Sequence, residues 1–138
     1  SNTHNFKTIG EKLDFSLAFP SVTTGTEWFD IIEDCKDNCF SFFVVTLNNG
    51  LNEKINSVYS RAERGETIKA ISGYKSLLSE LEGKHHGSEG ALYTDIINLL
   101  VKSGDNSGAR EWYQKMISSK APRLDQYIKN LNSRGIKF

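Results

Sequence analysis

The stretch from Gly90 to Pro122 constrains the fold most, because it holds two helical patterns separated by a turn. Apolar residues from Ala91 to Val101 recur three, four and seven positions apart, which fits the helix period of 3.6 and not the alternation of a strand. Lys102-Ser103-Gly104-Asp105 is typical of a helix end, and Ser88 is the expected N-cap. A second apolar stripe lies at Ala109, Trp112, Tyr113, Met116 and Ile117. Two antiparallel helices ending before Pro122 are predicted.

A weaker copy of this pattern lies upstream, from Leu51 to Leu81. Gly65-Glu66 takes the place of the turn, Ala70 that of Ala109 and Tyr74 that of Tyr113. The spacing between the copies is lengthened by the polar linker 82–87. The sequence therefore predicts two consecutive helical hairpins over residues 51–122.

The two hairpins resemble tetratricopeptide repeats. The residues that carry this resemblance are Tyr93, Ile96, Gly104-Asp105, Ala109, Tyr113 and Pro122. Ile97 and Met116 depart from the family pattern, which has small residues there, and the Lys and Asn pairs that clamp a C-terminal carboxylate are not reproduced as a set. The resemblance implies a scaffold that binds a protein or peptide on the inner faces of its first helices. By position, the partner-binding residues would be Asn52, Ile55, Tyr59, Thr94, Asn98 and Lys102.

The first third of the chain has strand-like patterns instead. Leu13 to Phe19 alternates apolar and polar residues, Trp28 to Ile32 is a second candidate strand and Phe40 to Leu47 a third. We expect residues 4–47 to form a small antiparallel sheet that caps the first hairpin. A final helix over Leu124 to Asn132, within residues 123–138, would cap the other end. The predicted fold class is α+β, with residues 1–138 in a single domain.

Cys35 and Cys39 can be interpreted in three ways. Across a tight loop they could form a disulfide, which would fix the register of the flanking strands. They could also be two free thiols in a reducing cytoplasm, or a redox-active pair, although the spacing is not Cys-x-x-Cys and the acidic neighbours disfavour a reactive thiolate. The disulfide is the preferred interpretation. It indicates a periplasmic or secreted protein whose export signal has been removed, with Ser1-Asn2 a tag remnant; the alternative is cytoplasmic.

Composition and motifs argue against several classes of function. Seventeen basic and seventeen acidic residues balance, which disfavours nucleic-acid binding, and no apolar run approaches the roughly 18 residues of a transmembrane segment. His85 and His86 lack further metal ligands nearby, so we expect no metal site. The acidic cluster of Asp30, Glu33, Asp34 and Asp37 lacks the spacing of a calcium loop and is interpreted as solvated. We predict no catalytic residue and no cofactor.

The sequence thus favours a non-catalytic protein-protein interaction scaffold, and its composition resembles that of small exported bacterial proteins. The alternative is a small ligand-binding module or enzyme that uses the cleft between sheet and helices. A third possibility is a structural domain of a larger assembly factor. The sequence predicts neither the identity of the partner protein or peptide nor the oligomeric state.

Overall fold

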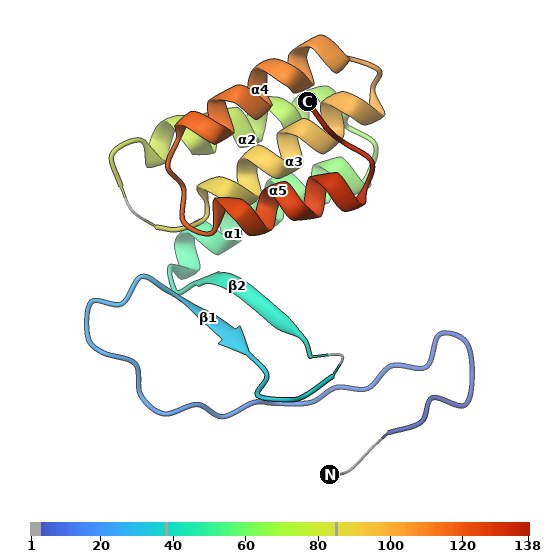
Figure 1. Cartoon of the computed structure of the whole chain (residues 1–138), viewed down its shortest axis with the longest axis vertical. Helices are drawn as coiled ribbons and strands as arrows, with labels where there is room; N and C mark the ends of the chain where they lie inside the picture. Colours follow the sequence, from blue (N-terminus) through green and yellow to red (C-terminus); the bar gives the residue numbers. More distant parts are fainter. Residues whose placement is uncertain (1–3, 38, 85) are drawn as a thin grey trace.

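The computed structural model of the chain describes residues 4–37, 39–84 and 86–138. In these residues an antiparallel two-stranded sheet is followed by five helices packed in consecutive pairs, which confirms the predicted α+β class (Figure 1). The elements are β1 (Trp28–Ile32), β2 (Ser41–Thr46), α1 (Asn49–Glu63), α2 (Thr67–Leu81), α3 (Glu89–Lys102), α4 (Asn106–Ser118) and α5 (Leu124–Ser133).

Both predicted helical hairpins are present. Gly65 and Gly104 connect their helices with φ of 78° and 86°, a backbone conformation that glycine adopts without a steric penalty. Ala70 and Ala109, the small residues predicted at the contact between paired helices, are both completely buried. The core of the helical part consists of Leu51, Val58, Ala70, Tyr74, Leu77, Leu81, Leu92, Ile96, Ile97, Leu100, Ala109, Met116, Leu131 and Ile136.

Side-chain caps fix two of the helix starts. The Asn48 side chain accepts a hydrogen bond from Leu51 N at the start of α1, and Asp105 accepts one from Gly108 N at the start of α4. Ser88 precedes α3 at the predicted N-cap position, but its side chain makes no capping hydrogen bond. Ser88 has helical dihedral angles, φ −80° and ψ −8°, whereas a capping residue is extended. Its hydroxyl lies 2.6 Å from Thr46 Oγ1 and so links α3 to the sheet.

The chain ends against the helical part. The predicted C-terminal helix is confirmed as α5. The residues after it fold back, so that Ile136 joins the core and the Phe138 ring packs against Tyr113 with centroids 5.5 Å apart. The last helix and the tail thereby cover the exposed side of the second hairpin.

The sheet contains a β-bulge. Trp28 pairs with Thr46 and Ile32 with Ser41, but the register shifts between these pairs. At the bulge Val44 has a φ of 56°, and its backbone N donates to Asp30 Oδ1 at 2.8 Å instead of to a strand carbonyl. Two of the predicted strands are therefore confirmed, with the second spanning 41–46 and not 40–47.

The remaining predicted strand, Leu13 to Phe19, does not form. These residues belong to an extended N-terminal arm, residues 4–27, that pairs with neither β1 nor β2 (Figure 1). Their alternating side chains are exposed, and Phe15 keeps 72% of its surface. Alternation gives a segment two faces, but a strand also needs a backbone partner, and a local pattern does not supply one.

The sheet was expected to cover the first hairpin, but it lies against the N-terminal ends of α1, α3 and α5. Asn52 of α1 donates from Nδ2 to Thr46 O at 2.9 Å, and the Thr46 hydroxyl meets Ser88 before α3. Arg123, before α5, donates from Nε to Asp30 Oδ2 at 2.8 Å. The sheet is thus held to the helix starts by polar contacts, together with the buried side chain of Val44.

Candidate functional site

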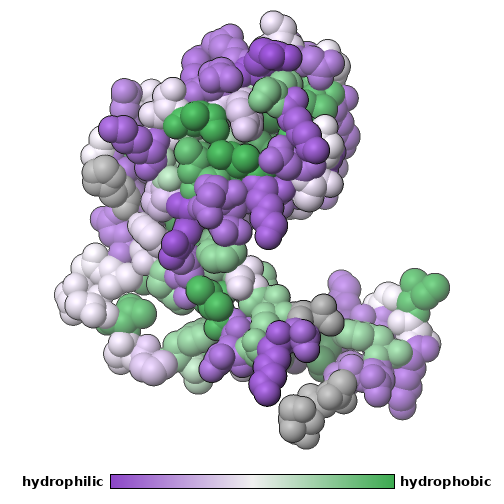
Figure 2. Space-filling view, in the orientation of Figure 1, coloured by the Kyte–Doolittle hydropathy of each residue, from purple (hydrophilic) through white to green (hydrophobic). Residues whose placement is uncertain are grey.

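A groove runs between β2, α3 and α5, and its volume is about 450 Å³. Figure 2 shows the hollow between the helical part and the sheet in the orientation of Figure 1. The strand contributes apolar side chains, whereas the two helices contribute most of the polar ones. The lining consists of Ser41, Phe42, Phe43, Val44, Val45, Ala91, Thr94, Asp95, Asn98, Gln126, Tyr127, Asn130 and Arg134.

Helix periodicity brings the polar groups of the groove into two rows. On α3, Asp95 and Asn98 are three residues apart and therefore lie on one face. Gln126 and Asn130 on α5, and Arg134 directly after it, follow each other at four-residue intervals and line the same groove. An amide side chain presents both a donor and an acceptor, so Asn98, Gln126 and Asn130 can each pair with an N–H or a C=O group of a peptide backbone.

Asp95 is the carboxylic acid that lines the groove, and its pKa is raised. Burial raises the pKa of its carboxyl from 3.8 to about 6, against the opposing effects of a hydrogen bond from the Tyr74 hydroxyl and of the Arg134 charge. Burial also raises the pKa of Tyr74, and the neighbouring Asp95 charge adds to that effect. A carboxyl that is costly to ionise and lies in a groove is a frequent mark of a functional site.

The six sequence-predicted partner-binding residues are in different environments. Thr94 and Asn98 line the groove, although the Thr94 hydroxyl is already bonded to Gly90 O at 2.8 Å. Asn52 holds the end of β2. Ile55 packs against the core, Tyr59 keeps 53% of its surface exposed, and Lys102 is exposed at the last turn of α3. The structure therefore brings two of the six together in the groove.

Sequence reasoning missed Asp95, Asn130 and Arg134. A signal was present for Asp95, which lies one helical turn before Asn98 and so shares its face. For α5 the four-residue spacing of Gln126, Asn130 and Arg134 indicates a polar face, but only the packed structure shows that this face lies opposite α3 and β2.

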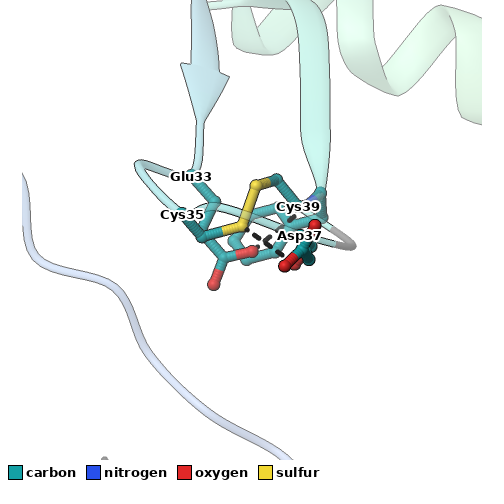
Figure 3. The surroundings of a disulfide bond; sticks show 5 residues. Glu33, Cys35, Asp37 and Cys39 are labelled. Carbon is teal, nitrogen blue, oxygen red and sulfur yellow. Dashed lines mark hydrogen bonds between the residues drawn. A yellow bond between two sulfur atoms is a disulfide. The ribbon is translucent and has the colours of Figure 1, made fainter.

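The loop between the strands is closed by the Cys35–Cys39 disulfide, with the two Cα atoms 5.7 Å apart (Figure 3). Glu33 and Asp37 lie beside the bridge, and Glu33 accepts from Phe40 N. The predicted acidic cluster is wrong in one member, because Asp30 points toward the helices to bind Arg123. A solvated loop is confirmed for the remaining three acids, Glu33, Asp34 and Asp37, which are exposed.

Within residues 4–37, 39–84 and 86–138, no group of three or more His, Cys, Asp or Glu side chains is placed to hold a metal ion. His85 of the predicted histidine pair lies outside the described residues. His86 Nδ1 lies 3.3 Å from Glu27 Oε2 and so joins the linker between the hairpins to the segment before β1.

A larger cavity, of about 750 Å³, lies on another side of the helical part, between α2, α4 and the start of α3. Its aromatic floor is the Trp112 ring, which already has two ammonium groups over it. Lys75 Nζ is 4.9 Å and Lys115 Nζ 4.4 Å from the ring centroid. Lys115 is also paired with Glu111 at 2.7 Å, so the charges around this ring are largely engaged within the protein.

Comparisons with known families, with curated proteins and with solved structures found no match for this chain. Among the helices described, none is long and apolar enough to cross a membrane. The groove's geometry is therefore the main guide to function.

Proposed function

We propose that this protein is a non-catalytic, tetratricopeptide-like interaction scaffold that binds an extended peptide segment of another protein in the groove between β2, α3 and α5. The observation that carries the proposal is that Asp95 and Asn98 on α3 line one groove with Asn130 on α5 and with Arg134, the residue after α5. The two helical hairpins support it, because the resemblance implies that the first helix of each hairpin, which is α3 in the second, presents the binding face.

The chemistry of the groove favours a peptide backbone as ligand. Asn98, Asn130 and Gln126 supply amide donors and acceptors, while Phe43 and Tyr127 supply apolar surface for the side chains between them. Most of these groups are half-buried in the free protein, so their side chains are already partly ordered. The entropy cost of fixing them on binding would therefore be small.

Peptide selection tests this function because it does not require the partner to be identified first. Random peptides displayed on phage would be selected against the protein, and the selected sequences titrated by fluorescence anisotropy. We expect Asn98→Ala and Asn130→Ala each to weaken binding about tenfold. Each variant loses the hydrogen bonds of one amide side chain, which contribute roughly 1.4 kcal/mol to binding. Asn132→Ala, an exposed position on α5, is the matched control and should bind normally. Peptides that bind both groove variants with unchanged affinity would exclude the groove.

A small-ligand site or an enzyme in the same groove is the second candidate, and Asp95 is the observation that favours it. A carboxyl with a pKa of about 6 can exchange a proton near neutral pH, as a general acid or base must. A small molecule that binds the groove should raise the temperature of thermal unfolding. If this protection is lost in Asp95→Asn, the result would favour this candidate over peptide binding.

The disulfide supports a periplasmic or secreted location for the scaffold, because such bridges persist in oxidising compartments. Equilibration of the folded protein in glutathione buffers, followed by alkylation and intact mass, would measure how readily the bridge is reduced. A bridge that opens at the redox poise of the cytosol would favour the cytoplasmic alternative.

A further inference from the structure

The sheet has an outer face that points away from the helices. Side chains of a strand alternate between faces, and Asp30 is turned toward the helices by its bond to Arg123. Its neighbours Phe29 and Ile31 therefore point outward. The register adds their cross-strand partners to this outer face, namely Val45 and Phe42. An apolar surface of four large side chains results.

The N-terminal arm begins on this outer face and then leaves it. The ring of Phe19 packs edge-on against Phe29 with centroids 6.3 Å apart. From there toward the N-terminus the arm runs past the loop between the strands and away from the helices (Figure 1). Leu17, Phe15 and Leu13 continue the apolar alternation, and their side chains are 50%, 72% and 46% exposed. Phe29, Ile31 and Val45 are half-buried, but Phe42 stays 56% exposed, so the chain's own arm leaves part of the face uncovered.

We propose that two copies of the chain associate, with residues 13–19 of each arm lying on the outer sheet face of the other copy. A two-stranded sheet with an incompletely covered apolar face is marginal in water and is stabilised by further packed elements. The arm has the matching pattern, since every second side chain is apolar over a length similar to that of β2. In a reciprocal exchange about a two-fold axis, the arm of each copy lies on the outer face of the other. No arm or face is left over, so the assembly closes at two copies.

The exposed area is sufficient for such a dimer. Six large side chains are about half exposed in each copy: Leu13, Phe15, Leu17, Phe19, Phe40 and Phe42. At about 200 Å² for each large side chain they offer about 600 Å² per copy, or about 1,200 Å² in all, the lower end of the range for specific interfaces. The chain has a formal net charge of zero, so two copies do not repel each other at long range.

Light scattering coupled to size exclusion tests the proposal over a range of protein concentrations. We expect the wild-type mass to rise toward twice 15.5 kDa, and the Phe15→Asp/Leu17→Asp variant to remain at 15.5 kDa. This variant changes only residues outside the helices and strands, so its fold should be retained, as circular dichroism would show. Ile68→Asp, at a position on α2 that is 84% exposed, is the matched control and should still dimerise.

A second variant locates the other half of the contact. Phe42→Asp places a charge on the outer face and should also abolish the dimer. A wild-type protein that stays at 15.5 kDa at the highest concentration would overturn the proposal. A dimer that survives either the arm variant or Phe42→Asp would overturn it too, because the exchange needs both surfaces. Phe42 also borders the groove, whereas Phe15 and Leu17 do not. Loss of the dimer with peptide binding retained in the arm variant therefore separates this proposal from peptide binding.

Discussion

Replacing Asp95 by asparagine should stabilise the protein at neutral pH. The carboxyl has a pKa of about 6 in the folded protein and 3.8 in its ordinary environment, a difference of about two pKa units. Each unit corresponds to about 1.4 kcal/mol, so the ionised carboxylate reduces the free energy of unfolding by up to about 3 kcal/mol at pH 7. Asparagine is uncharged and nearly isosteric, and its amide oxygen can still accept from the Tyr74 hydroxyl.

The sign of the pH dependence follows from the direction of the shift. The folded state binds the Asp95 proton more tightly than the unfolded chain, because its pKa is raised. This contribution to stability is complete below about pH 4 and is lost as the pH rises to about 6. Asp95→Asn should therefore gain stability over wild type as the pH rises. The difference in unfolding free energy should be smallest near pH 4 and reach about 1–3 kcal/mol at pH 7, a range that allows for partial solvation of the carboxylate.

Urea unfolding followed by circular dichroism at several pH values measures this difference directly. Asp125→Asn, which removes an exposed carboxylate from the first turn of α5, is the control for a change of net charge. The assignment of a buried carboxylate that is costly to ionise would be refuted if Asp95→Asn were no more stable than wild type at pH 7. It would also be refuted if the stability difference did not change between pH 4 and 7, because burial would then not disfavour the ionised carboxylate.

Three further substitutions test the packing. Gly90→Ala would place a Cβ 2.3 Å from the Tyr127 ring and should lower the unfolding free energy by about 1–3 kcal/mol in urea titrations, by overpacking the contact of α3 with α5. Asp105→Ala removes the N-cap of α4 and should cost about 1 kcal/mol in the same assay. Cys35→Ser removes the disulfide, whose short loop contributes about 2 kcal/mol of stability at most. Amide hydrogen exchange should become faster in β1 and β2 and stay unchanged in the helices.

The helices could be predicted from the sequence because their determinants are local. In α3 and α4 the apolar stripes, the turn glycine Gly104 and the cap Asp105 all lie within a few residues of the structures they specify. The buried alanines Ala70 and Ala109 could be located for the same reason, since each sits at a fixed offset from its turn.

The sheet and the groove depend on residues far apart in the chain, so the sequence predicted them less well. Asp30 belongs by sequence to an acidic loop, and its actual partner, Arg123, is 93 residues away. Leu13 to Phe19 has a strand's alternation but depends on a distant edge for its hydrogen bonds. Asp95 lies between Thr94 and Ile96 in a helix that supplies much of the core, and only the approach of α5 shows that it lines a groove.

The polar attachment of the sheet to the helix starts has a mechanical consequence. Tension applied between the two chain ends would reach α1 through the short connection that follows β2, and it would also load the bonds that hold the sheet to the other helices, chiefly Asp30 to Arg123 and Thr46 to Ser88. These bonds would rupture first, and the hairpins would unfold only at higher force because their contacts are spread over a continuous apolar core. A protein tethered at its ends would thus lengthen in two stages, with the groove lost in the first.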